Sequence, residues 1–575
     1  GVNIAFAGCF PKHDDADAVA KRLAHFGFNA VRLHHMDMQP YPNGIFADGK
    51  LETLSPEALE RLDYFISALK REGIYSNINL HVSRWYSKAH NWPGADRTES
   101  FDKIVDIFYP ELIAVQKKYA RDLLGHVNAY TKLRYADDPA VAIVEINNEN
   151  SIFMWGSDQH LGELPEPFAA ELKKQWNAWL VSQYTSRDKL ATAWNAGLEK
   201  DGPNLVTDPN CETLGKPGSN WATEMHNGAK MTLIRDDGGV KLTVPAAVDP
   251  AWHLQFNCVP VSLKKGQVYA VRFLARADKP GARLTVGTQQ AHEPYETMGL
   301  SGGLDLTADW QEYQLGFKAA KDDDRVKLNF CSAYQPASVW IKNVQLFSGG
   351  QVGLRTDEDP AAGSVAVCKK GQPFASLRLR DWHRFLQEID EKYFVGMYSF
   401  LKKDLGVKCA VTGTIAYGPL GTIGQAKMDF VDQHSYWEHP HFPRRQWDMN
   451  DWVINNKPMS DSPQGSTMAG LVTTRVLGKP YTVTEYQHSA PNEWQAECMP
   501  MIATIAAAQD WDGVFIFAYS HNQNYKKQRM ELLRHRRQPG EDGSLAAGRP
   551  AVPRRRGAAA GGAHRHPPRR HAIPR

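Results

Sequence analysis

The sequence predicts an α/β protein, a (β/α)8 TIM barrel with a β-sandwich of the jelly-roll type inserted into one loop. Two observations predict the barrel: the chain has eight short apolar runs, and helical patterns alternate with most of them, as parallel strands with crossover helices require. A third predicts the insertion, since residues 205–350 change to short strand-like segments separated by Gly, Pro and Asp turns. A doubly wound open sheet is the alternative architecture.

The eight apolar runs are the expected barrel strands: Val2–Ala7, Ala30–Leu33, Ser76–Val82, Ala140–Ile146, Val407–Thr412, Phe430–His434, Tyr481–Thr484 and Val514–Ala518. Between the first two, the apolar residues of 15–27 predict a helix that Gly27 ends. Residues 55–73 predict another, with Ser55 at the N-cap, Pro56 in the first turn and Gly73 after the last turn.

These patterns divide the chain into four parts. Residues 1–204 hold barrel strands one to four, residues 205–350 the inserted carbohydrate-binding-like sandwich, and residues 351–525 strands five to eight. Residues 526–575 form a low-complexity tail with 14 Lys and Arg and 3 Asp and Glu, so its net charge is +11. Two explanations of the tail stay open: a disordered basic extension, or an out-of-frame translation of a GC-rich gene, which we prefer.

Composition excludes several classes of protein. The total net charge of +3 leaves −8 for residues 1–525, so the body of the chain is not expected to bind nucleic acid. No apolar stretch approaches the roughly 20 residues of a membrane span, and the seven scattered cysteines predict neither a disulfide framework nor a zinc site. We expect no metal and no cofactor. The chain begins at Gly1, which fits a product whose signal peptide was removed, so we expect an extracellular or periplasmic location.

Catalytic side chains of such barrels lie at the carboxyl ends of the strands. In this sequence the polar residues at those ends are Arg32, His34 and His35 (strand two), His81 (three), Asn148 and Glu149 (four), His434 and Tyr436 (six), Glu485 (seven), Tyr519 and His521 (eight). Their joint placement is more informative than any one of them, because a single Glu or His at a strand end is more often a salt-bridged or buried structural residue.

Two carboxylates facing each other across one barrel mouth are the groups that cleave a glycosidic bond with retention, at a separation of about 5–5.5 Å. We predict Glu149 as the acid/base and Glu485 as the nucleophile. Arg32 is expected to keep Glu485 ionised, and a less polar setting is expected to leave Glu149 protonated. Glu145 lies nearer mid-strand and is expected to be buried and paired.

This ordered set resembles the clan A glycoside hydrolases, most closely family 5, which contains cellulases and mannanases. The passages GFNAVRLHH and EINNEN carry the resemblance, together with His81, His434-x-Tyr436 and Glu485. The resemblance implies that Asn148 binds the sugar 2-hydroxyl and that Tyr436 hydrogen-bonds the nucleophile. It implies a polysaccharide or oligosaccharide substrate with β-linkages, bound through these expected residues: Arg32, His81, Asn148, His434, Tyr436, Tyr519, Trp155 and Trp437.

One departure is that Tyr519-Ser520-His521 stands where the family usually has a tryptophan after strand eight. The inserted segment, with VSLKKGQVYAVRFLARAD and VWIKNVQLF, resembles a carbohydrate-binding module of the family 4/9 type. In it, Trp221 and Trp252 are the candidate ligand-binding aromatics, whereas Trp310 and Trp340 are expected in the core.

Two other functions stay open. A metal-dependent hydrolase on the same barrel would use His34, His35, His81 and His434, but the LHH passage lacks an HxH pair and the strand-seven Glu is left without a role. A non-catalytic carbohydrate-binding protein would use the sandwich and keep the barrel only as a scaffold. The oligomeric state is open.

Overall fold

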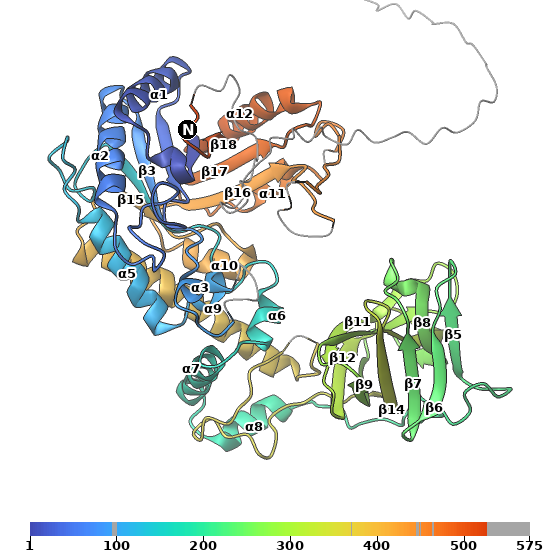
Figure 1. Cartoon of the computed structure of the whole chain (residues 1–575). Helices are drawn as coiled ribbons and strands as arrows, with labels where there is room; N and C mark the ends of the chain where they lie inside the picture. The colour runs from blue at the N-terminus through green and yellow to red at the C-terminus, as the bar shows by residue number, and fades with distance from the viewer. Residues whose placement is uncertain (95–100, 370, 444–447, 449, 463–464, 526–575) are drawn as a thin grey trace, which may run out of the picture.

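The computed structural model describes residues 1–94, 101–369, 371–443, 448, 450–462 and 465–525. The chain forms two bodies: a barrel from its first and last parts, and a sandwich of strands from its middle (Figure 1). The basic tail that the sequence singles out, residues 526–575, lies outside the described residues.

Eight parallel strands form the barrel, and all eight predicted strands are present. Their order around the sheet is β15-β4-β3-β2-β1-β18-β17-β16. The two end strands meet through Asp429 N–H to Val411 C=O (3.0 Å) and Ala416 N–H to Asp432 C=O (3.3 Å), so the barrel is nearly closed. The strands are β1 (Val2–Ala5), β2 (Ala30–His34), β3 (Tyr75–His81), β4 (Val141–Asn147), β15 (Ala410–Thr412), β16 (Val431–Trp437), β17 (Tyr481–His488) and β18 (Gly513–Ser520).

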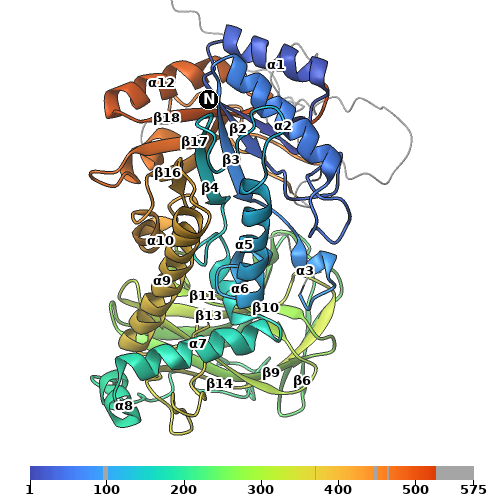
Figure 2. The ribbon, with the colours of Figure 1, turned by 90° about the vertical axis from the view of Figure 1, so that its left-hand side faces the viewer.

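Helices cover the barrel strands on the outside (Figures 1 and 2). The two helices predicted from their end signals are confirmed: the Ser55 hydroxyl accepts from Ala58 N–H at the start of α2, and Gly27 follows α1 with a φ of +80°. The helices of the chain are α1 (His13–His25), α2 (Pro56–Arg71), α3 (Tyr86–Ala89), α4 (Asp102–Val105), α5 (Pro110–Leu124), α6 (Ser157–Gly162), α7 (Phe168–Gln183), α8 (Arg187–Asn195), α9 (Ser376–Ser399), α10 (Gly418–Gln425), α11 (Thr467–Thr473) and α12 (Cys498–Gln509).

The sandwich has two antiparallel five-stranded sheets, ordered β11-β10-β13-β8-β5 and β12-β9-β14-β7-β6. Alternating apolar residues of both sheets, among them Phe256, Phe273 and Phe330, fill the space between them. The strands are β5 (Trp221–Met225), β6 (Thr232–Asp236), β7 (Gly239–Val244), β8 (Leu254–Leu263), β9 (Val268–Ala277), β10 (Ala282–Gln290), β11 (Thr297–Leu306), β12 (Gln311–Lys318), β13 (Asp323–Cys331) and β14 (Ala337–Ser348). The sequence predicts eight of these ten and misses β5 and β11.

Tryptophans pack against one another on the helices that precede and follow the insertion. The chain passes through α7 and α8 before the sandwich and returns through α9 (Figure 2). Trp176 of α7 is fully buried, stacks on Trp194 of α8 (6.0 Å between ring centroids) and meets Trp382 of α9 edge-on (5.3 Å). This aromatic cluster gives the junction a packed apolar core.

Among the described residues, no helix has the length and hydropathy needed to span a membrane. All seven cysteines are free thiols, and six of them are buried.

Candidate active site

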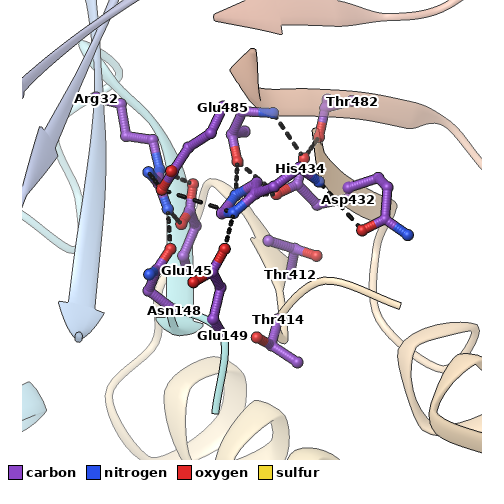
Figure 3. Close-up of polar contacts among 12 residues, drawn as sticks. Arg32, Glu145, Asn148, Glu149, Thr412, Thr414, Asp432, His434, Thr482 and Glu485 are labelled. Carbon is purple, nitrogen blue, oxygen red and sulfur yellow. Dashed lines mark hydrogen bonds and ion pairs between the residues drawn. The ribbon is translucent and has the colours of Figure 1, made fainter. Parts of the chain in front are cut away.

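The two predicted catalytic glutamates meet at the barrel mouth. Glu149 lies two residues after the end of β4, and Glu485 lies on β17. One carboxylate oxygen of each, together with a ring nitrogen of His434 on β16, lie within 4.8 Å of one another. Figure 3 shows the His434 ring between the two carboxylates. This separation is close to the roughly 5–5.5 Å of carboxylates that act on one anomeric centre with retention.

Glu485 is surrounded by donors. Its Oε1 accepts from Arg32 Nη1 at 2.6 Å and lies 3.3 Å from His34 Nε2, while its Oε2 accepts from the Tyr436 hydroxyl. The sequence predicted both the Arg32 contact and the Tyr436 contact. Arg32 and Tyr436 thus fix both carboxylate oxygens of Glu485 in place, as a positioned nucleophile requires.

Arg32 organises the floor of the site. It is fully buried, and all five of its N–H groups donate: to Glu145 at 2.8 and 2.6 Å, to Glu485, to Asn148 Oδ1 at 2.8 Å and to Asn3 Oδ1 at 3.0 Å. Glu145 is buried and paired, as predicted. Because Arg32 occupies Asn148 Oδ1, the group that Asn148 can present to a ligand is its amide NH2.

Glu149 is held from several sides. Its Oε1 lies 2.9 Å from His434 Nδ1, and its backbone carbonyl accepts from the Tyr417 hydroxyl at 3.1 Å. Its backbone is left-handed, with a φ of +55°. Non-glycine residues in this conformation are uncommon and cluster at functional sites, where the surrounding structure holds them in place. The turn at Glu149 takes the chain out of β4 and into the loop over the mouth.

The charge state of Glu149 differs from the prediction. Burial alone would raise the pKa of this carboxyl, but the hydrogen bond and charge of His434, with Lys103 and Arg32 behind it, lower the pKa to about 2. For His434, burial would lower the pKa, but the carboxylates of Glu485, Asp432 and Glu149 raise it to about 10. The expectation of a protonated Glu149 in a less polar setting is therefore wrong for the ligand-free site, because a histidine that the sequence placed among substrate contacts pairs with it.

His81 does not offer a nitrogen to the substrate. Its Nδ1 lies 3.1 Å from Asp37 Oδ2 and its Nε2 lies 2.6 Å from Asp106 Oδ2. Burial would lower the pKa of His81, but these two carboxylates raise it to about 9. The prediction that His81 binds the substrate is thus corrected: its ring joins the loops after β2 and β3, and its carbonyl accepts from Asn148 N–H at 2.7 Å.

Two aromatic predictions also fail. Trp437 is 8% exposed, packs in the core beside β16 and β17, and donates its Nε1–H to the Lys457 carbonyl at 2.9 Å, so no ring face is open to a sugar. The Tyr519 hydroxyl accepts from Arg22 of α1 at 3.3 Å, so this side chain turns toward the helix layer. Trp155 is 66% exposed and meets Tyr417 edge-on at 5.1 Å, next to the backbone of Glu149.

Phe517 is the aromatic residue of β18 that the sequence analysis missed. Its buried ring meets His34 edge-on at 5.8 Å and Tyr436 at 5.9 Å, so it packs directly behind the two residues that hold Glu485. The run FIFAY contains three aromatics in alternate positions, and the strand-end rule selected Tyr519, the one nearest the end of the strand.

The four histidines proposed for a metal site do not converge in the described structure. His81 pairs with aspartates, His34 Nδ1 lies 2.7 Å from Asn79 Oδ1, and His35 stacks on Phe6. Glu149, His434 and Glu485 are spaced closely enough for a cation. Their nearest atoms already hydrogen-bond one another or Arg32, whose positive charge opposes a cation, so we do not assign them as metal ligands.

The sandwich tryptophans divide differently from the prediction. Trp221 is buried and stacks on Phe256 at 4.6 Å, so it is a core residue rather than a ligand platform. Trp252 is 56% exposed, as a platform requires. Trp340 is buried as predicted, whereas Trp310 is only partly buried and lies under Lys342 and Arg276.

Comparisons with known proteins give two family matches. Residues 3–227 match cellulase (glycosyl hydrolase family 5), and residues 204–338 match a carbohydrate binding domain of the 4/9 type. A search of curated proteins finds no match.

Solved carbohydrate-binding modules resemble part of this chain. One, described under "CBM4 structure and function", is 23% identical over 27% of this chain and 97% of its own, with a TM-score of 0.21. The second N-terminal cellulose-binding domain of Cellulomonas fimi β-1,4-glucanase C is 20% identical over 27% of this chain and 99% of its own, with a TM-score of 0.22. The two family matches, one to a glycosyl hydrolase family 5 cellulase domain and one to a carbohydrate-binding domain of the 4/9 type, together support glycosidase activity.

Proposed function

We propose that this protein is a retaining glycoside hydrolase that cleaves β-glycosidic bonds of a polysaccharide or oligosaccharide by double displacement. One observation carries the proposal: the carboxylates of Glu149 and Glu485 lie within 4.8 Å but have different partners. Glu485 accepts hydrogen bonds from Arg32 and Tyr436, which position it as a nucleophile, whereas Glu149 pairs with the titratable ring of His434. A substrate of polymer size, which does not cross membranes, agrees with the expected extracellular or periplasmic location.

In the first step, Glu485 attacks the anomeric carbon while Glu149 protonates the departing oxygen. In the second step, Glu149 takes a proton from water, and the water oxygen displaces Glu485 from the same carbon. The amide NH2 of Asn148, whose oxygen Arg32 holds, is the donor for the neighbouring sugar hydroxyl. The exposed Trp155 ring, which meets Tyr417, the residue that donates to the Glu149 carbonyl, is the candidate stacking surface for the leaving group.

The experiment that tests the proposal measures hydrolysis of a panel of β-linked glucans, mannans and galactans by wild type, Glu149→Gln and Glu485→Gln. Each variant is expected to lose at least about 100-fold in kcat, the scale of losing acid–base assistance alone. Glu391→Gln on the outer helix α9 is the matched control and should retain activity. Full activity in either site variant would remove that residue from the mechanism, and activity that a chelator abolishes would favour the metal-dependent alternative.

A second activity, carbohydrate binding by the sandwich, is favoured by the surroundings of Trp252. Gln255, whose Nε2 donates to the Trp252 carbonyl at 2.9 Å, and Asn257, two residues further along β8, each have a buried side-chain oxygen without a hydrogen-bond partner among the described residues. A flat apolar ring next to acceptors that need donors suits the faces and hydroxyls of a sugar. Trp252→Ala should weaken retention on insoluble polysaccharide without changing hydrolysis of a small glycoside. The same substitution of Trp310 is the control, and retention unchanged by Trp252→Ala would refute the assignment.

A further inference from the structure

The hydrogen bonds of His434 fix which of its ring nitrogens carries a proton. Its Nε2 lies 2.9 Å from Thr484 Oγ1 and 3.4 Å from Asp432 Oδ2. The Thr484 hydroxyl itself donates to Asp432 Oδ2, and a carboxylate only accepts. Since a threonine hydroxyl has one hydrogen, Thr484 Oγ1 can only accept from His434. Nε2 therefore carries a proton in every state of the ring.

This arrangement leaves Nδ1 of His434 for Glu149, at 2.9 Å. Two states satisfy that contact: a charged imidazolium donating to the Glu149 carboxylate, or a neutral ring accepting from a protonated Glu149. Both contain the same single proton. The Glu149–His434 contact thus holds one proton that either partner can carry. In the proposed mechanism this proton lies next to the leaving-group oxygen of a bound substrate.

We propose that the proton delivered by Glu149 is held by the Glu149–His434 pair, and that Asp432 and Thr484 are positioning residues that keep His434 Nδ1 directed at Glu149. This inference rests on the proposed retaining mechanism and identifies the source of the proton that Glu149 delivers. Asp432 is 2% exposed, and Thr482 Oγ1 (2.5 Å) and Thr484 N–H (3.1 Å) also donate to it, so the carboxylate is fixed in place.

The two chemical steps balance around this pair. In the first step, Glu485 Oε bonds to the anomeric carbon as the glycosidic C–O bond breaks. The single proton of the pair passes from His434 Nδ1 to Glu149 and from Glu149 to the leaving oxygen, so His434 is neutral and Glu149 is ionised when Glu485 loses its charge in the ester. In the second step, water gives its proton to Glu149 and its oxygen to the anomeric carbon. The proton returns to His434 as the Glu485 carboxylate is regenerated.

The geometry explains why the proton moves when it is needed. Glu485 Oε1 lies 3.6 Å from His434 Nδ1, so the nucleophile's charge holds the proton on the ring until the ester forms. Several other charged and titratable groups face the pair. They are Asp432 from β16, Arg32 and His34 from β2, Tyr436 from β16, Tyr417 after β15 and Lys103 from α4.

The test compares pH profiles of kcat/KM for wild type, Asp432→Asn, Thr484→Val and Thr484→Ser, each checked for folding by thermal unfolding. The fall of kcat/KM at high pH (the basic limb of the profile) reports loss of the proton held by the Glu149–His434 pair. Asp432→Asn removes a negative charge 3.4 Å from Nε2 and should move that limb down by about 1–3 pH units. Thr484→Val should also move it down, and Thr484→Ser, which keeps the hydroxyl, should restore the wild-type position.

Two β-glycosides distinguish a loss of proton donation to the leaving group from a general loss of catalytic activity. A dinitrophenyl glycoside leaves without protonation, whereas an alkyl glycoside requires the acid. Above the limb, Asp432→Asn should lose at least tenfold more activity on the alkyl glycoside than on the dinitrophenyl glycoside. Equal losses on both substrates, or an unmoved limb in Asp432→Asn and Thr484→Val, would overturn the inference while leaving retaining hydrolysis intact. Wild type that hydrolyses neither glycoside nor any polysaccharide of the panel would instead refute the proposed function.

Discussion

Replacing Arg32 with lysine keeps the positive charge but removes the guanidinium fork. Arg32 makes five hydrogen bonds with no exposed surface, and an ammonium group has only three donors. At least two buried acceptors therefore lose their partner. Each unmade bond of this charged type costs about 1.5–3 kcal/mol, so Arg32→Lys should lower the free energy of unfolding by about 3–6 kcal/mol. If Glu485 loses one such bond in the transition state, kcat falls by roughly 10–150-fold.

The assay combines urea unfolding with kcat per folded molecule on an unactivated β-glycoside. Arg378→Lys is the matched control, because Arg378 is as buried as Arg32. It makes four hydrogen bonds, two of them to Glu358, and all four acceptors lie in the segment that connects the sandwich to α9. It should be destabilised by about 1.5–3 kcal/mol with an unchanged kcat. An Arg32→Lys enzyme that is destabilised but has the wild-type kcat would refute the role of Arg32 in holding the nucleophile.

Further predictions concern four other side chains of the barrel. Burial raises the pKa of Asp390 to about 7, so the folded state keeps a proton that the unfolded chain loses near pH 4, and stability falls as pH rises between these values. Asp390→Asn should therefore be more stable than wild type at pH 8 and equal to it at pH 4 in urea unfolding; the reverse order would contradict this sign. Trp437→Ala should lower the unfolding free energy by about 3–5 kcal/mol, whereas Trp155→Ala should raise KM without changing Tm. Phe517→Ala should lower kcat by loosening His34 and Tyr436, and an unchanged kcat would show that the ring only fills space.

The barrel could be predicted because its strands are short apolar runs with clear end signals, such as Ser55 and Gly73 around α2. Two sandwich strands could not. β11 contains Gly299, Gly302 and Gly303, a composition typical of turns, yet Gly303 lies where a side chain would meet Arg283 and Gly299 has a φ of +120°. β5 has only five residues, and its one buried tryptophan, Trp221, looked like a ligand-binding aromatic.

The positions of the site residues could be predicted from strand ends, but their pairings could not. Strand-end placement brought Arg32, Glu149, His434, Tyr436 and Glu485 together, as the structure has them. The errors have one physical origin: a sequence does not show which nitrogen or ring face is already occupied. Asp37 and Asp106, whose carboxylates contact the two ring nitrogens of His81, lie in loops far from His81 in sequence. The Lys457 carbonyl, which accepts from Trp437 Nε1–H, is also not a sequence neighbour of its partner. No strand pattern pairs such groups.

Chemical rescue with azide tests the assignment of the two glutamates most directly. With an activated β-glycoside and sodium azide, Glu149→Ala should regain activity and yield the β-glycosyl azide, because azide replaces water on the intact glycosyl-Glu485 ester. Glu485→Ala should yield the α-glycosyl azide, because azide occupies the place of the missing nucleophile. The same anomer from both variants, or rescue of neither in an otherwise active enzyme, would contradict the assignment.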